Sequence, residues 1–178
     1  MHHILANGAM LQTRKNLTAP EKSPYFVNSI GDSYVSFQTD YGVKYYAGFD
    51  PDDVSLPEEL VWQFAIVNIN NKKSPRDSKV RQTIIAIVEN FFLQNNEVML
   101  YICETGDGKQ SMRNRLFSYW INYHKKNWNV SFWSSSVKDE NGVVNYATII
   151  VRNDNPRFDK IAEKFADTIQ LFNEKPKE

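Results

Sequence analysis

The residues best suited to chemistry lie in one short segment, where charged side chains follow an apolar run. The carboxylates of Glu104 and Asp107 stand three positions apart, and the cations Lys109 and Arg113 follow them. Ligands of open α/β sheets bind beyond the carboxyl ends of the strands, where this segment is expected to lie. Paired carboxylates there can share proton-transfer work, and the cations can hold an anion. These four residues are our candidate ligand or anion site.

Asp107 also has a structural explanation. Gln110 follows it by three positions, a capping-box pattern in which the carboxylate accepts hydrogen bonds from the first free N–H groups of a helix. Gly106 and Gly108 permit the positive φ angles that a strand reversing into a helix often needs. The run from Gly106 to Lys109 lacks the earlier glycine of a P-loop, so it predicts at most a loosely held anion. We therefore expect no catalytic residue here.

Other catalytic chemistry has little support. His124 is the only histidine beyond the first three residues, so any serine or cysteine nucleophile would have to pair with it. The acidic stretch from Asp50 to Glu59 lacks the glycine and the alternating oxygen ligands of a calcium loop, and a solvated loop is the simpler interpretation. We expect no metal site and no cofactor, and we favour a protein that is not an enzyme.

A one-sided charge distribution gives a second candidate. From Gly108 through Lys138 there are six cations and no Asp or Glu, and aromatic residues are interleaved with them. Proteins that bind single-stranded nucleic acid use this combination. Arg115 and Lys126 lie eleven positions apart, so they share a helix face, and Lys125 lies on the neighbouring ridge. These three form our candidate basic surface for a protein or nucleic-acid partner.

Two structural alternatives to this surface stay open at this point. The aromatic residues would serve the core, and the acidic stretch would neutralise the cations through salt bridges. The helix after Asp107 carries Met112, Leu116, Tyr119, Trp120 and Tyr123 at helical spacing, which predicts a buried stripe. We accordingly expect Leu116, Trp120 and the preceding Cys103 to be buried.

The remaining elements follow from alternation, capping and helical periodicity. We expect strands at 25–27, 35–38, 43–47, 60–69 and 98–104, a helix from Ser74-Pro75-Arg76-Asp77 with Ile84 and Val88 buried, a hairpin of 128–137 and 143–152, and a last helix from Asn155-Pro156. This order predicts an α+β fold in a single domain. Its sheet is mixed, mostly antiparallel, with about six to seven strands, and three main helices cover it.

The composition is that of an ordinary folded protein. The 178 residues carry 21 Lys plus Arg and 21 Asp plus Glu, so the global charge indicates no particular partner. The single cysteine, Cys103, indicates a reduced, cytoplasmic thiol, and no run reaches the roughly 20 apolar residues of a membrane span. We expect an extension at 1–22, in which residues 1–9 are either native or a cloning remnant, a domain at 23–174 and a tail at 175–178.

One motif set resembles a known family. Its residues are Tyr101-Ile102-Cys103-Glu104, Gly106-Asp107-Gly108, Lys109-Gln110, Arg113, Arg115, Phe117 and Trp120. This set looks like the recurring core of an uncharacterised bacterial protein family of unknown function. The resemblance extends more weakly back to the first hairpin. It implies a bacterial, cytoplasmic protein and gives no mechanism.

The order of elements is also similar to the later half of the GCN5-related N-acetyltransferase fold, which runs strand, helix, strand, helix, hairpin. That family holds the coenzyme A pyrophosphate on backbone N–H groups of a Gly-rich loop before the helix. The corresponding stretch here, residues 71–77, has no glycine, and Pro75 removes one donor. The similarity implies an acetyltransferase-like topology without the usual cofactor loop.

Two functions therefore stand side by side. The first is a non-enzymatic regulatory or interaction domain with a protein or nucleic-acid partner. The alternative is a small-molecule binder or enzyme on an acetyltransferase-like scaffold, acting through the Glu104–Lys109 turn. A cleft around Glu104, Asp107 and Arg113 would favour the alternative, and a convex basic face would favour the first.

Overall fold

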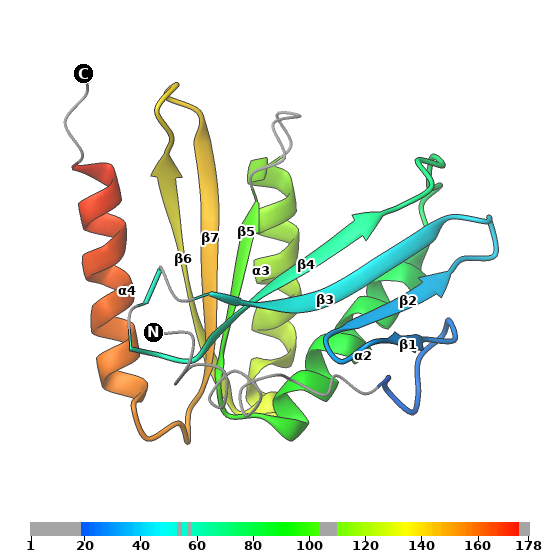
Figure 1. The fold of residues 1–178 in the computed structure, drawn as a ribbon, viewed down its shortest axis with the longest axis horizontal. Helices are drawn as coiled ribbons and strands as arrows, with labels where there is room; N and C mark the ends of the chain where they lie inside the picture. The colour runs from blue at the N-terminus through cyan, green and yellow to red at the C-terminus, as the bar shows by residue number, and fades with distance from the viewer. Residues whose placement is uncertain (1–18, 53–54, 57, 104–109, 175–178) are drawn as a thin grey trace. The chain divides into compact units, whose positions relative to one another are not determined.

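The computed structural model describes residues 19–52, 55–56, 58–103 and 110–174 (Figure 1). The elements are β1 (Asn28–Ile30), β2 (Tyr34–Gln38), β3 (Lys44–Asp52), β4 (Val61–Asn68), α2 (Ser78–Gln94), β5 (Val98–Cys103), α3 (Gln110–Trp128), β6 (Val130–Lys138), β7 (Val144–Arg152) and α4 (Phe158–Asn173). The strands form one seven-stranded sheet in the order β1-β2-β3-β4-β5-β7-β6. The β4–β5 pair is parallel, whereas the β1–β2, β2–β3, β5–β7 and β6–β7 pairs are antiparallel. The predicted α+β class is confirmed.

The chain divides into two compact units, and each is described by itself. The first unit comprises the described residues up to 50 together with 65–91, and the second comprises those of 51–64 and from 92 onward. The predicted domain boundaries after residues 22 and 174 are not tested by this division and stay a prediction.

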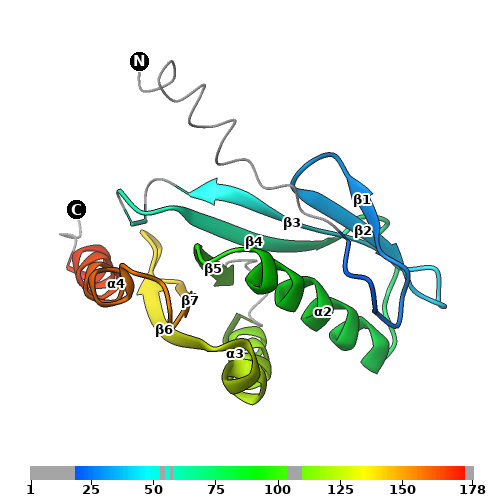
Figure 2. The same cartoon turned by 90° about the horizontal axis from the view of Figure 1, so that it is seen from below.

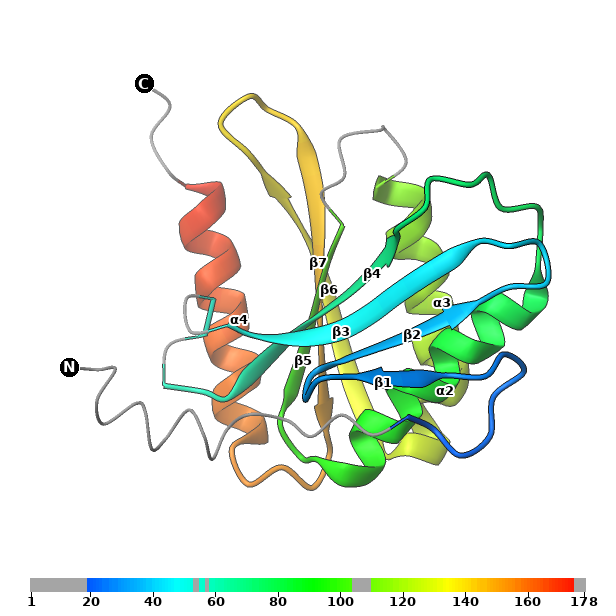
Figure 3. The ribbon, with the colours of Figure 1, turned by 45° about the vertical axis from the view of Figure 1, so that its right-hand side comes forward.

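The first unit packs α2 against its antiparallel strands, which run side by side in Figure 3. The rings of Phe49 and Phe91 stack with their centroids 4.4 Å apart, and both side chains are fully buried. Ile84 and Val88 are buried as predicted. The predicted strands at 35–38 and 43–47 form the β2–β3 hairpin, and Gly42 in its turn has φ 76°, in the left-handed region.

Two predicted boundaries in this unit are wrong. Residues 25–27 do not form a strand, and the first strand begins at Asn28. The helix begins at Ser78 rather than Pro75, because Asp77 is the residue that caps it: the N–H of Lys79 donates to the Asp77 Oδ1 at 3.0 Å. Ser74 instead donates to the carbonyl of Pro75.

The second unit places α3 and α4 on opposite faces of its strands, as Figure 2 shows for the β6–β7 hairpin. On one face, Ile161 and Phe165 of α4 pack in a core cluster with Ile149 of β7. On the other face, Asn114 of α3 accepts a hydrogen bond from Thr148 at 3.0 Å. Because neighbouring residues of a strand point to opposite faces, Thr148 and Ile149 fix the side on which each helix lies.

The buried face of α3 is not the predicted one. Phe117 and Ile121 are buried, and Phe117 stacks on Tyr101 of β5 with centroids 4.1 Å apart. Leu116 is 49% exposed, so its predicted burial is wrong, and Trp120 is only half-buried. Two faces of this helix carry aromatic residues at helical spacing. The sheet contacts the face of Phe117, not the face of Leu116 that the sequence predicted to be buried. The side chain of Cys103 lies outside the described part of the chain.

Candidate functional site

The outer face of α3 carries an exposed apolar stripe beside two cations. Met112, Leu116, Tyr119 and Tyr123, which are 53%, 49%, 64% and 71% exposed, recur at i, i+4, i+7 and i+11. Arg115 and Lys126 are exposed as well, and their spacing places them next to the stripe. We call these six residues the outer α3 face. It contains the very side chains that the sequence assigned to the core.

No carboxylate of the described residues forms an ion pair with Arg115, Lys125 or Lys126. The acidic stretch that was the expected partner is engaged elsewhere. Asp50 accepts a hydrogen bond from the hydroxyl of Tyr34, and Glu59 binds two cations of α4 and its preceding turn. The salt-bridge alternative therefore finds no support in the described structure.

Glu59 is buried, which corrects its interpretation as part of a solvated loop. Its side chain is only 3% exposed and accepts hydrogen bonds from Arg157 at 2.7, 2.8 and 3.0 Å and from Lys164 at 2.8 Å. The bonds from Arg157 hold the pKa of the Glu59 carboxyl below its ordinary value, with help from Lys164 and against the effect of burial. A buried carboxylate with two paired cations ties the segment before β4 to α4, so we assign it a structural role.

A hollow of about 590 Å³ lies where α3 ends and β6 begins. Its lining comprises Lys125, Lys126, Asn129, Val130, Ser131, Phe132, Trp133 and Asn153. The Lys125 Nζ stands 6.0 Å from the centre of the Phe132 ring, within reach of a cation–π contact. Ser131 donates to the Asn153 side chain at 2.6 Å, and Asn153 donates to Asn129 at 3.0 Å. The hollow thus combines two cations, two aromatic rings and a polar network.

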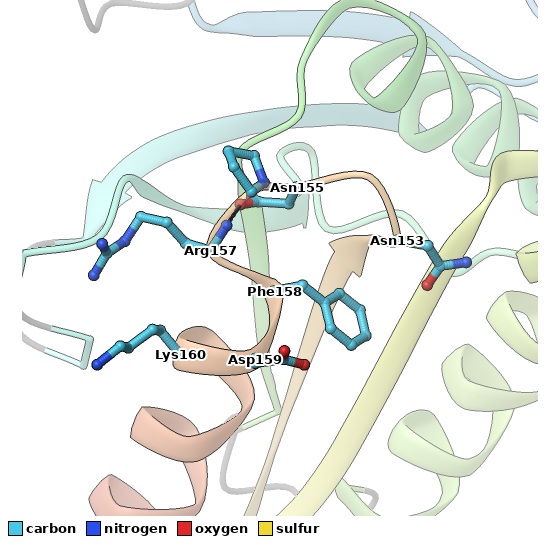
Figure 4. Close-up of a pocket in the computed structure, with 7 residues that line it drawn as sticks. Asn153, Asn155, Arg157, Phe158, Asp159 and Lys160 are labelled. Atoms are coloured by element: carbon cyan, nitrogen blue, oxygen red, sulfur yellow. Dashed lines mark hydrogen bonds between the residues drawn. The ribbon is translucent and has the colours of Figure 1, made fainter.

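A second hollow, of about 500 Å³, lies at the start of α4 (Figure 4). The side chains of Arg157 and Lys160 point to one side, away from Phe158 and Asn153. The Arg157 guanidinium is committed to Glu59. Because its charged groups do not converge, this hollow presents no arrangement suited to catalysis or to anion binding.

The candidate ligand site cannot be assembled from the described residues. Glu104, Asp107 and Lys109 lie outside them, and Arg113 is half-buried on α3. The site stays a prediction. In the part of the chain that is described, no three His, Cys, Asp or Glu side chains gather as a metal site, and no helix is long and apolar enough to cross a membrane.

Sequence reasoning found the three cations but missed the groups around them. Phe132 and Trp133 belong to the aromatic residues interleaved with the cations in the sequence. Asn129, Ser131 and Asn153 carry neither a charge nor a ring, so the charge pattern does not point to them. The sequence does hold a signal for Asn129, because an asparagine at the end of a helix often adopts the left-handed conformation that closes it. Asn129 lies directly after α3 and has φ 55°. No local pattern predicts that Asn153, at the end of the next strand, lies beside it.

Fold and site together define a class: an α+β protein with a mixed seven-stranded sheet and a basic, aromatic surface at the end of α3. Residues 76–167 match the family of unknown function designated DUF6169, and the chain belongs to that family. The predicted membership of an uncharacterised family is thereby confirmed. No match was found among the curated proteins.

Proposed function

We propose that this chain is a non-enzymatic interaction module whose outer α3 face binds an acidic, amphipathic helix of a partner protein. The observation that carries the proposal is the stripe of four apolar side chains, each about half or more exposed, along one helix. The motif resemblance supports a bacterial, cytoplasmic setting for this module.

The chemistry of the stripe favours a protein over a nucleic acid. Tyr119 and Tyr123 would serve either partner, because tyrosine rings stack on bases and also pack against side chains. Met112 and Leu116 extend the stripe with aliphatic groups, which offer no stacking surface to a base. An i, i+4, i+7, i+11 row is the pattern with which one amphipathic helix meets another.

The charges beside the stripe indicate the sign of the partner. Arg115 and Lys126 have no carboxylate among the described residues, and no acidic residue occurs between Gly108 and Lys138 in the sequence. Charged groups at the rim of an interface select the partner and speed its association more than they add affinity. Because Arg115 and Lys126 lie on the same side of the stripe, we expect glutamate or aspartate residues along the flank of the partner's apolar face that meets them.

The test compares two probes by fluorescence anisotropy at several salt concentrations. One probe is a labelled amphipathic peptide with leucines at i, i+4, i+7 and i+11 and flanking glutamates; the other is single-stranded oligo-dT. We expect the peptide to bind, and Leu116→Ser and the double variant Arg115→Glu/Lys126→Glu each to weaken it at least about tenfold, which is about 1.4 kcal/mol. The matched control is Lys160→Glu, an exposed cation on α4.

Two results would overturn the proposal. Equal peptide affinity in the parent and both variants would remove the outer α3 face as the binding surface. Tighter binding of oligo-dT, with a steep loss as salt rises and loss in the Arg115→Glu/Lys126→Glu variant, would make the partner a nucleic acid, because each neutralised phosphate releases counterion.

The alternative function is a small-molecule binder or enzyme on an acetyltransferase-like scaffold. It is supported by the strand order, in which parallel β4 and β5 are followed by the antiparallel strands β7 and β6. Its ligand would lie at the Glu104–Lys109 turn. Binding of acetyl-coenzyme A would favour this alternative over the interaction module.

A further inference from the structure

β6 is the last strand of the sheet, so one of its edges has no neighbouring strand among the described residues. The N–H of Asp139 donates to the carbonyl of Val143 at 2.9 Å, and the Asn129 carbonyl accepts from the N–H of Asn153 at 2.8 Å. Odd-numbered residues therefore direct their backbone groups toward β7. Because these directions alternate along a strand, the even-numbered residues direct their N–H and C=O groups to the open edge.

One end of this edge is already satisfied by a side chain. The amide of Asn173, the last residue of α4, donates to the carbonyl of Ser136 at 3.2 Å and accepts from the N–H of Lys138 at 3.5 Å. A side-chain amide presents an N–H donor beside a carbonyl acceptor, as a peptide group does. Asn173 therefore occupies the position that a peptide group of an added strand would take.

The other end of the edge is open. Among the described residues, nothing bonds to the outward N–H and C=O groups of Phe132 and Ser134. The hollow of about 590 Å³ borders this same stretch, since Val130 to Trp133 line it. Unpaired backbone groups at a strand edge beside a hollow are what an extended peptide needs in order to add a strand.

We propose that the β6 edge from Val130 to Ser134 receives an extended, acidic segment of a partner protein as an added β-strand. The charge of the occupant follows from the hollow, where Lys125 and Lys126 stand beside the edge without a carboxylate from the described residues. Main-chain hydrogen bonds to Phe132 and Ser134 supply the pairing. The polar network of Asn129, Ser131 and Asn153 borders the occupant's end. This surface overlaps the outer α3 face at a single residue, Lys126.

The test uses a labelled peptide, Thr-Glu-Val-Glu-Val-Glu-Thr, with anisotropy for affinity and amide hydrogen exchange by NMR for the binding mode. In the free protein, we expect the Phe132 and Ser134 amides to exchange faster than the Trp133 amide, because of these three only Trp133 directs its N–H toward β7. We expect the peptide to slow exchange at Phe132 and Ser134. A peptide with alternate N-methylated amides cannot pair and should bind at least about tenfold more weakly.

Two pairs of variants sharpen the result. Ser134→Pro removes the outward N–H but no bond to β7, a position at which an edge strand tolerates proline. Ser134→Ala is its control, because it removes the same hydroxyl contacts to Asn114 and Thr148 and keeps the N–H. Lys125→Glu should weaken binding several-fold, whereas Lys138→Glu, at the end occupied by Asn173, should not.

Each contrary outcome has a distinct meaning. If the parent does not bind the peptide at millimolar concentration, or binds it without protecting Phe132 and Ser134, the proposed strand addition is wrong. Concentration-dependent self-association that protects these amides would make the occupant a second copy of this chain and overturn the acidic peptide. Leu116→Ser should leave the affinity for this strand peptide unchanged, because Leu116 belongs to the outer α3 face. The strand-addition proposal can therefore fail while the helix-binding proposal holds, and the reverse.

Discussion

At the scale of single residues, Glu59 shows how a charge cluster in the sequence can conceal a buried ion pair. The preceding residue, Glu58, is also acidic, and its side chain is 84% exposed. Glu59 itself is enclosed and accepts hydrogen bonds from Arg157 and Lys164, which lie 98 and 105 positions away in the sequence. What distinguishes Glu59 from Glu58 is its contact with a segment far away in the sequence. The spacing of residues in the sequence carries no information about such a contact.

Replacing Glu59 with Gln should lower the free energy of unfolding by about 2–3 kcal/mol at pH 7, the usual range for lost hydrogen bonds to a charged group. Because the pKa of Glu59 is lowered in the folded state, its contribution is fully present above the ordinary value of 4.5 and is lost as the pH falls through the lowered folded pKa. The difference between parent and variant should therefore shrink below about pH 4.5.

Urea unfolding at several pH values measures this difference. Glu58→Gln is the control and should change stability by less than about 0.5 kcal/mol, as is usual for exposed pairs. A Glu59→Gln protein as stable as the parent at pH 7 would show that the ion pair is not structural.

At the scale of elements, α3 decides how the candidate site is understood. The 3.6-residue period predicts that a helix forms, but two of its faces carry aromatic residues. Phe117 and Ile121 meet the sheet, while Tyr119 and Tyr123 face solvent. The hydroxyl of tyrosine tolerates exposure, so tyrosines in a stripe are weaker evidence for burial than phenylalanine or isoleucine.

Phe117→Ala should therefore destabilise the protein by about 3–5 kcal/mol, the range for truncating a buried aromatic residue. Leu116→Ala, one position earlier and half exposed, should cost well under about 1 kcal/mol, because it leaves little cavity. Thermal unfolding of the two variants side by side measures the contrast. The reverse order would mean that Leu116 faces the core, as its sequence pattern predicted.

Much of the element order could be read from the sequence, and the reasons are local. Alternation marked the two strands of the first hairpin, and helical periodicity marked α4, whose Ile161 and Phe165 are buried in the core. The predicted start of α2 at Pro75 is too early, because Ser74 and Pro75 have the residue types common at a helix N-terminus although the helix begins at Ser78. The surroundings of Lys125 could not be read, because Phe132 and Asn153 reach it only through strand pairing.

At the scale of the whole molecule, the proposed similarity to the acetyltransferase fold makes a prediction about coenzyme A that the sequence of one connection argues against. The connection from Asn71 to Asp77 has no glycine, and Pro75 has no N–H. Backbone N–H groups therefore cannot gather around a pyrophosphate as they do in a Gly-rich loop.

We accordingly expect acetyl-coenzyme A to bind more weakly than about 1 mM, or about −4 kcal/mol. Titration calorimetry of the full chain measures this directly. Micromolar affinity would favour the enzyme or small-molecule alternative over the interaction module. Desulfo-coenzyme A is a suitable companion ligand, because it keeps the pyrophosphate and lacks the reactive thiol.

The single side chain of Asn173 has a consequence for how this protein behaves in a crowded cell. Open strand edges are templates for runaway stacking into insoluble aggregates, and folded proteins shorten or block them. Asn173 covers the Ser136–Lys138 end of the β6 edge, and it can do so only when α4 is docked on the sheet. In a chain whose last helix is not docked, this end of the edge would be open as well, so we expect loss of α4 docking to favour aggregation through β6.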